Sequence, residues 1–385
     1  MEKIAFILDR FNSFTPTRSG ATATIYYHCC TQAIAEGLKP LVFARPDTAG
    51  HAPFPGLPVI PVTPPEVPAG GPALFAARAE RKLLGYRQML HRTYIGNVLR
   101  ALRENSLEAA PKITSNDPEL AVVLSRKFPE APVLHWFHNH LPCKPRFRNA
   151  LVAGAVRCVA VSNASARWAE ADYGFTTGRV RTVYNAVDHT LFVPNALLPP
   201  GPTVLNFVGH LGHEKGPDIL LDAALCLAKK GLRFGLQLVG SNSFEGVMLD
   251  DYQRGLAATA AELERLGVPV RRTGYVAHRD VAAEVGKAHI HVFTSRWDEP
   301  FGMATLEGMA CGLATVASNT GGTPEVVGDA GFLFERGNVQ QLAAHLERLI
   351  LDENLRAEYG AKARRRAEQF TWAKTWAGIR EVVTR

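Results

Sequence analysis

The feature that most constrains the fold is a repeated alternation of short apolar segments with longer helical ones. In the second half it begins with a strand at Val204–Val208, a helix at 217–230 and a strand at Gly235–Val239. Strands that alternate with helices indicate βαβ units, because a parallel strand pair needs a crossover, usually a helix. The alternation continues through a helix at 250–266, a strand at 270–275, a short helix ending at Lys287, strands at 290–293, 314–318 and 331–335, and helices at 338–350 and 353–370.

The N-terminal half follows the same alternation. A continuous apolar run at 3–9 predicts a first buried strand, and a helix over 21–37 ends at Gly37 before the next strand. The rest of this half is predicted as strands at 40–44, 112–114, 131–137 and 156–161, a helix at Pro118–Lys127, and a helix from Ala164 capped by Ser162 and Asn163.

A chain of 385 residues exceeds one ordinary hydrophobic core, so two domains are expected. A proline-rich segment near 193–203 interrupts the alternation and indicates a linker. The predicted fold class is α/β, with two doubly wound Rossmann-like domains facing a central cleft. The predicted boundaries are an acceptor-binding domain at 1–188, a linker at 189–202, a donor-binding domain at 203–370, and a C-terminal helix at 371–385 that packs back towards the N-terminal domain.

Two segments of the N-terminal half depart from the alternation. Residues 46–72 contain nine prolines, a density that predicts a long irregular excursion. Residues 73–104 read as a long basic helix with an apolar stripe. Such a helix either lies on an anionic membrane or turns its stripe towards the core, and the sequence leaves both alternatives open.

Bulk properties are those of a globular protein, and the basic charge is uneven. Residues 1–190 carry 22 Lys and Arg against 14 Asp and Glu, whereas the remainder carries 21 against 22. A basic half suits nucleic acid, an anionic membrane surface or phosphorylated substrates, but no nucleic-acid-binding module is visible, so a solvated basic surface is favoured.

No signal peptide, membrane span or zinc-ligand spacing is recognisable, and none of the six cysteines forms a C-x-x-C pair. We expect a cytoplasmic protein with reduced thiols and no bound metal.

Residues 289–325 read as strand, loop, helix, strand and loop, with a potential anion site in the first loop. Pro300 ends the strand region, and a helix is predicted from Met303 to Cys311. The start of a helix presents unpaired N–H groups that bind phosphates. Glu299 precedes this start and Glu307 follows it, and carboxylates accept hydrogen bonds from vicinal hydroxyls. A nucleotide sugar is therefore a candidate ligand. On spacing alone, a helix-capping Glu299 and an exposed Glu307 explain the pattern equally well.

Six ordered motifs in the second half add specificity. Glu299 and Glu307 are separated by seven residues, and around them stand Val208-Gly209-His210-Leu211 with Glu214-Lys215-Gly216, Leu238-Val239-Gly240, Thr273-Gly274-Tyr275-Val276, Gly321-Gly322-Thr323-Pro324-Glu325 and Phe370-Thr371-Trp372. In these motifs residues 183–375 resemble the retaining glycosyltransferases of family 4, which have the GT-B fold; the first domain resembles them in layout.

The resemblance implies roles for individual residues. Glu299 would face the donor sugar and Glu307 the ribose diol. Lys215 would pair with the donor diphosphate and stabilise the charge that develops on it as the glycosidic bond breaks. His138 would approach the sugar from the acceptor side, making Glu299, Lys215 and His138 the expected catalytic residues. The expected donor-binding residues are Gly20, His210, Gly240, Tyr275, Phe301, Gly302, Met303, Glu307 and Gly322.

Two positions depart from the family pattern. His210 stands where an arginine is usual, and an imidazole lacks the bidentate phosphate contact of a guanidinium. Phosphate neutralisation would then fall on Lys215 alone or on Arg18. Ala186 stands where glycine is common.

The resemblance implies transfer of a hexose-type sugar from a UDP- or GDP-sugar, with retention, without a metal and without a cofactor. The acceptor would be a glycan, a lipid-linked sugar or a small aglycone, in cell-surface glycan, glycolipid or natural-product glycoside synthesis. A peripheral contact with the anionic inner membrane face stays open, and no nucleic-acid partner is expected. The alternatives are a non-catalytic nucleotide-sugar-binding protein and another GT-B enzyme such as a sugar-nucleotide epimerase.

Overall fold

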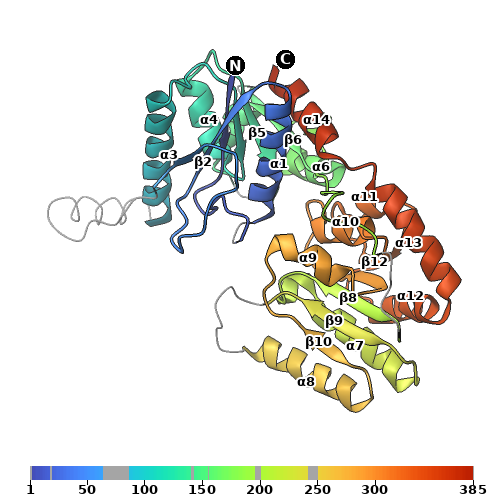
Figure 1. Cartoon of the computed structure of the whole chain (residues 1–385). Coiled ribbons are helices and arrows are strands. Elements are labelled where there is room, and N and C mark those ends of the chain that lie inside the picture. The colour runs from blue at the N-terminus through green and yellow to red at the C-terminus, as the bar shows by residue number, and fades with distance from the viewer. Residues whose placement is uncertain are drawn as a thin grey trace. The chain divides into compact units, whose positions relative to one another are not determined.

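The structure, a computed structural model, describes residues 2–17, 20–63, 86–139, 143–154, 156–195, 201–241 and 250–384, with only the backbone described for 86–90. These residues form two compact units (Figure 1). The N-terminal unit comprises Met1–Val161, Ser165–Val183 and Ala373–Arg385, and the C-terminal unit comprises Ser162–Ala164 and Tyr184–Trp372.

The N-terminal unit is built on a seven-stranded sheet in the order β3-β2-β1-β4-β5-β6-β7, with every pair parallel. The strands are buried apolar segments, as expected where helices cover both faces. Its strands are β1 (Lys3–Ile7), β2 (Lys39–Ala44), β3 (Val59–Pro61), β4 (Lys112–Ser115), β5 (Val133–Phe137), β6 (Arg157–Ala160) and β7 (Arg181–Thr182). Its helices are α1 (Ala21–Ala35), α3 (Tyr86–Glu104), α4 (Pro118–Lys127), α5 (Pro145–Val152), most of α6 (Asn163–Tyr173) and nearly all of α14 (Trp372–Thr384).

The C-terminal unit has a six-stranded parallel sheet in the order β10-β9-β8-β11-β12-β13. The order reverses between β8 and β11, which is the switch point where doubly wound folds keep their ligands. Its strands are β8 (Val204–Val208), β9 (Gly235–Val239), β10 (Val270–Arg272), β11 (Ile290–Phe293), β12 (Ala314–Ser318) and β13 (Phe332–Phe334). Its helices are η1 (His213–Lys215), α7 (Pro217–Lys229), α8 (Asp251–Arg265), α9 (His278–Val285), α10 (Met303–Ala310), α11 (Thr323–Val327), α12 (Val339–Leu351) and α13 (Glu353–Ala367).

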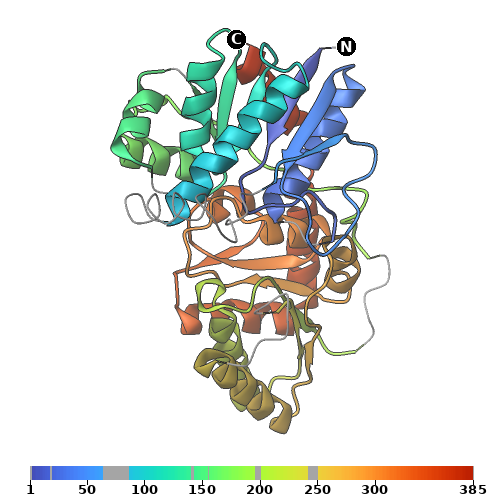
Figure 2. The same cartoon turned by 90° about the vertical axis from the view of Figure 1, so that its left-hand side faces the viewer.

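Helices cover the sheet of the C-terminal unit as the doubly wound pattern requires (Figure 2). Helix α7 packs against α8 and α12, while α10 packs against α11 and α13. The apolar residues of α7, including Leu220, Leu221 and Leu227, pack with residues of β8 and β9 in one buried core. Both sheets are thus parallel and Rossmann-like, and the predicted α/β fold class is confirmed.

Several predicted elements need correction. The excursion over 46–72 is not wholly irregular, because β3 adds an edge strand there, where Pro61 is tolerated. The strand expected over 270–275 stops at Arg272. Helix α11 was not predicted, since five residues are too few for a helical period to show. The part of the basic helix before Tyr86 lies outside the described residues.

The start of α6 has an acidic partner that was not predicted. The backbone N–H groups of Asn163 and Ala164 donate to the Glu325 carboxylate, at 2.8 and 2.7 Å. Ser162 uses its hydroxyl to donate to the carbonyl of Pro300, at 2.6 Å. A carboxylate offers two acceptors to two N–H groups and a favourable charge at a helix start.

The C-terminal helix α14 packs within the N-terminal unit from Ala373 onwards. Its Trp376 is fully buried, and the indole N–H donates to Glu36, at 2.9 Å. Arg157 donates to the carbonyl of Val383, at 2.7 Å. In the part of the chain that the structure describes, no helix has the length and apolar character to cross a membrane.

Candidate active site

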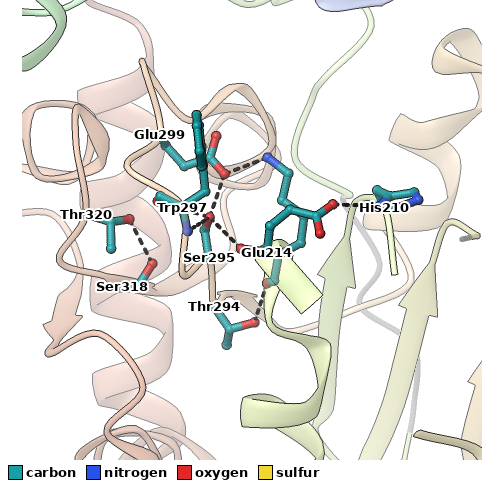
Figure 3. Close-up of polar contacts among 9 residues, drawn as sticks. His210, Glu214, Thr294, Ser295, Trp297, Glu299, Ser318 and Thr320 are labelled. Atoms are coloured by element: carbon teal, nitrogen blue, oxygen red, sulfur yellow. Dashed lines mark hydrogen bonds and ion pairs between the residues drawn. The ribbon is translucent and has the colours of Figure 1, made fainter. Parts of the chain in front are cut away.

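The centre of the site is an ion pair between two loops at the carboxyl edge of the C-terminal sheet. Lys215 Nζ lies 2.6 Å from Oε1 of Glu299. The Ser295 hydroxyl donates to the same carboxylate oxygen, at 2.7 Å (Figure 3). Glu299 is 7% exposed. A buried carboxylate needs such partners, and these two hold Glu299 in one orientation.

The backbone ties the two loops together next to this pair. The carbonyl of Glu214 accepts hydrogen bonds from the backbone N–H of Arg296 at 2.8 Å and of Trp297 at 3.1 Å. The Thr294 hydroxyl donates to the carbonyl of Gly216, at 2.7 Å. Gly216 has φ +64°, and a Cβ there would lie 2.3 Å from the Thr294 carbonyl oxygen, so only glycine fits.

A second ion pair, Arg296 with Asp218, joins the loop after β11 to the start of α7. Arg296 makes a bidentate contact with Asp218, with Nη1–Oδ1 and Nη2–Oδ2 distances of 2.7 and 2.5 Å. Tyr252 donates to Asp218, at 2.5 Å. Partial burial favours the neutral acid, but the hydrogen bonds from Arg296 and Tyr252 lower the pKa of Asp218 below its usual range. Asp218 is therefore a charged anchor at the start of α7.

The start of α10 is open to an anion, in the way the sequence suggests. Its N-cap is Gly302, with φ +98° and no side-chain cap. The alternative in which Glu299 caps this helix is wrong, since the Glu299 side chain bonds Lys215 and Ser295 instead. Phe301 is buried and Met303 is the first helical residue, so the free N–H groups follow directly on the Glu299 loop.

Two glycines hold the Glu299 loop from the other side. The N–H of Gly322 donates to the Glu299 carbonyl at 2.7 Å. A Cβ at Gly321 would lie 2.1 Å from that carbonyl oxygen, and one at Gly322 would lie 2.6 Å from the Pro300 carbonyl oxygen. Gly321 and Gly322 thus allow their backbone to lie close to the backbone of Glu299 and Pro300, where a side chain would not fit.

Glu307 is buried, with 6% of its surface exposed, so the alternative of an exposed helical glutamate is wrong. Its Oε1 lies 2.9 Å from Nε2 of His278, the first residue of α9. His278 was not among the predicted site residues. No local signal points to it, because the two residues are 29 positions apart and meet only through the fold.

His210 lies in the loop after β8 and is hydrogen-bonded to Glu214, with Nδ1 and Oε1 2.9 Å apart (Figure 3). Both side chains are about half exposed. Gly240 packs on this loop so closely that a Cβ would lie 2.0 Å from the Gly209 carbonyl oxygen. Tyr275, 44% exposed, follows Gly274, whose carbonyl accepts a hydrogen bond from the N–H of Gly240, at 3.1 Å.

The remaining predicted residues lie in the N-terminal unit. Gly20 is the N-cap of α1, without a side-chain cap. His138 follows β5 and is buried beside Trp136, with ring centroids 4.5 Å apart. Burial and the neighbouring His135 lower the pKa of His138 to about 3, so its ring is neutral at pH 7. Its Nε2 has no hydrogen-bond partner among the described residues. Arg18 lies outside them.

One polar cluster in the N-terminal unit was not predicted. Asp9, directly after the β1 region, accepts hydrogen bonds from the Phe11 N–H at 2.9 Å and from the side chains of Asn12 and Asn116 at 2.8 and 3.4 Å. Asn116 has φ +55°, a conformation that non-glycine residues adopt only rarely. A single aspartate at a strand end carried too little signal to find this cluster.

The described ranges contain no group of three or more His, Cys, Asp and Glu side chains arranged to hold a metal ion. All six cysteines are unpaired, and Cys29, Cys30, Cys158 and Cys311 are buried.

In sequence and in fold, the chain is similar to known glycosyltransferases. Residues 191–366 match the family model described as glycosyl transferases group 1. The D-inositol 3-phosphate glycosyltransferase of Thermobifida fusca is 32% identical over 252 residues, which cover 61% of this chain and 56% of that protein. The chain spans little more than half the length of the curated relatives it matches first.

Solved structures match over the whole chain. A glycosyltransferase from Rickettsia africae is 18% identical, with a TM-score of 0.76, covering 100% of this chain and 98% of that one. Anabaena HepE in complex with UDP-glucose is 21% identical, with a TM-score of 0.73 and 100% coverage of both chains. At these identities the likeness establishes the GT-B fold. Residues 191–366 therefore match the group 1 glycosyl transferases, and the chain as a whole has the GT-B fold.

Proposed function

We propose that this protein transfers a hexose-type sugar from a nucleoside diphosphate sugar to an acceptor hydroxyl, with retention of configuration and without a bound metal. The observation that carries the proposal is the contact of Lys215 Nζ with Glu299 Oε1 at 2.6 Å, immediately before the uncapped start of α10. A cation, a buried carboxylate and free helical N–H groups in one place are complementary to a diphosphate joined to a sugar.

In the proposed mechanism each group acts on a different part of the donor. Glu299 accepts hydrogen bonds from the sugar hydroxyls, with Ser295 holding its carboxylate in place. Lys215 and the N–H groups at Gly302 and Met303 stabilise the negative charge that grows on the departing diphosphate, and this lowers the barrier only to the extent that the contact strengthens in the transition state. The leaving diphosphate takes the proton of the acceptor hydroxyl on the same face, which retains the configuration.

A UDP-sugar is the first donor to test. HepE, which shares the fold, has been solved with UDP and with UDP-glucose. A GDP-sugar is the second donor, since the phosphate and sugar contacts proposed above do not distinguish the bases. His210 replaces the usual arginine, so we propose that Lys215 provides the main positive charge for the diphosphate.

We assign the acceptor to the N-terminal unit, where His138 lies at the carboxyl end of β5. Its neutral ring suits a hydrogen bond to a sugar or acceptor hydroxyl better than general-base catalysis near pH 7, because its pKa is about 3. A glycan, a lipid-linked sugar or a small aglycone would fit this assignment. We propose that the reaction takes place in the cytoplasm, with the basic N-terminal half available for an anionic membrane surface.

The test is a panel of UDP- and GDP-sugars, incubated with the purified protein and read by released UDP or GDP, with and without EDTA. Release from one donor class, unchanged by EDTA, is the expected result; product NMR then determines the anomeric configuration. Binding of UDP or GDP without any release in the presence of candidate acceptors would favour the non-catalytic binding protein. If the protein neither binds UDP or GDP nor releases either from any donor of the panel, the proposal is contradicted.

A further inference from the structure

His278 contacts Glu307, and this contact does not stabilise the start of α9, the helix to which His278 belongs. It is the first residue of α9, where a positive charge opposes the helix dipole. The N-cap, Ala277, makes no side-chain cap, and the acidic residue of the first turn is Asp280. The imidazole instead points to α10, with Nε2 2.9 Å from Oε1 of Glu307. The side chain is thus oriented for Glu307 rather than for α9.

The surroundings of the pair favour its charged form. Burial alone would lower the pKa of His278, but the hydrogen bond to Glu307 and the charges of Glu307 and Asp188 raise it above the ordinary value. The ring of Phe192 lies against the imidazole, with centroids 5.7 Å apart. Cys311 is a neutral thiol, because burial and the charge of Glu307 raise its pKa to about 12 against the opposing charge of Arg364.

The contact leaves Glu307 with one oxygen committed and the other available. Oε1 is held by His278, and the Glu307 side chain is only 8% exposed, so its rotamer has little freedom. A diol that donates two hydrogen bonds needs a carboxylate of fixed orientation, because a rotating acceptor loses most of the gain as entropy. We infer that His278 is a positioning residue that holds Glu307 for the ribose diol of the nucleotide and thereby sets the preference for a ribonucleotide donor. This inference rests on the proposed function.

The experiment compares UDP with 2′,3′-dideoxy-UDP, which lacks the diol, by isothermal titration calorimetry. In the wild type, UDP should bind more tightly. In His278→Ala, the affinity for UDP should fall roughly tenfold, the equivalent of one hydrogen bond to a charged group. The affinity for dideoxy-UDP should be unchanged. His278→Gln retains an N–H donor for Glu307 and should restore most of the preference. A loss shared equally by both ligands would mean a merely structural role and would overturn the inference, as would an unchanged preference in His278→Ala.

The pH dependence supplies a second readout. The preference for UDP should fall as pH rises above neutral through the raised pKa of His278, and it should be flat over that range in His278→Gln. The matched control is His51→Ala, which removes a histidine that pairs with a carboxylate, Asp47, at 2.6 Å in the N-terminal unit. This control substitution should leave the affinities for UDP and for dideoxy-UDP unchanged at every pH. A wild type that binds both ligands equally would overturn this inference alone, whereas a wild type that binds neither would contradict the proposed function and the inference with it.

Discussion

At the scale of single residues, the site depends on pairs that are distant in sequence. Lys215 and Glu299 are 84 positions apart, and Ser295 joins them through a hydroxyl that reaches the shared carboxylate oxygen. Each partner limits the freedom of the others. Removing one charge therefore leaves a buried partner unpaired as well as removing a contact to the proposed donor.

Lys215→Ala is expected to reduce turnover by roughly 100-fold or more, since it removes one electrostatic contact to the departing diphosphate. The measurement is kcat for UDP or GDP release with the best donor of the panel. Lys230→Ala is the matched control, because Lys230 also pairs with a glutamate, Glu347, at 2.6 Å on the exposed surface. Near-normal turnover in Lys215→Ala would reject the phosphate role.

At the scale of elements, glycines determine how closely the pieces of the site approach. Gly308 places α10 directly on β11: a Cβ there would lie 2.4 Å from Cγ of His291, whose side chain is fully buried. The same helix carries Glu307 and offers its open start to the proposed phosphate. Its position on the sheet therefore decides where both groups lie.

Gly308→Ala should lower the free energy of unfolding by roughly 1–3 kcal/mol, the usual cost of overpacking a rigid core. Urea denaturation of the whole chain checks this. Gly255→Ala in α8 is the control, since a Cβ there meets nothing within 4 Å, and it should stabilise by about 0.5–1 kcal/mol. Equal stability of the two variants would contradict the close-packing argument.

Helices α3 and α4 are joined by a charged contact that predicts a pH dependence. His91 Nε2 lies 2.7 Å from Asp117, the N-cap of α4, and Nδ1 lies 3.6 Å from Glu119. Burial would lower the pKa of His91, but the hydrogen bond to Asp117 and the nearby carboxylates of Asp117 and Glu119 raise it to about 9. The ordinary value is 6.5, so the pair stabilises the fold fully below about pH 6.5 and loses this contribution as pH rises through 9.

The contact of His91 with Asp117 and Glu119 contributes on the order of 1–3 kcal/mol to the free energy of unfolding at acidic pH. Free energies of unfolding of the wild type and His91→Leu, measured between pH 6 and pH 10, should differ most at the acidic end and converge at the alkaline end. A difference that is constant across this range would mean that packing, not charge, accounts for the effect of His91.

At the scale of the whole molecule, the two units are expected to respond differently to nucleotide. Apart from Gly20 and His138, the proposed donor contacts lie in the C-terminal unit, while the N-terminal unit carries the excess positive charge of the chain. A ligand that binds the folded state at 100 times its Kd stabilises that state by about 2.7 kcal/mol.

Hydrogen exchange with saturating UDP should therefore show its strongest new protection at the loop of Lys215 and at the start of α10. Binding of 2′-deoxyadenosine, tested under the same conditions, serves as the control because it lacks the diphosphate. Protection concentrated instead at the start of α1, near Gly20, would move the phosphate site to the N-terminal unit.

Much of the architecture followed from local patterns. The strands β8, β9, β11 and β12 and the helix α4 have the predicted bounds, because each is a short apolar run or an amphipathic period between clear breakers. The predictions missed features that depend on tertiary contacts. Strand β3 exists because β2 offers it an edge, and the backbone N–H of Ala164 donates to Glu325, 161 positions away.

The sequence by itself determined that the chain alternates strands and helices, that two units form, and that Glu299, Glu307 and Lys215 belong to one family pattern. Only the tertiary structure decided their partners: Glu299 with Lys215 and Ser295, and Glu307 with His278. The reason is physical. Periodicity and breakers act over a few residues, whereas a buried carboxylate is satisfied by whichever donors the fold brings within 3 Å, and Lys215 and His278 come from other parts of the chain.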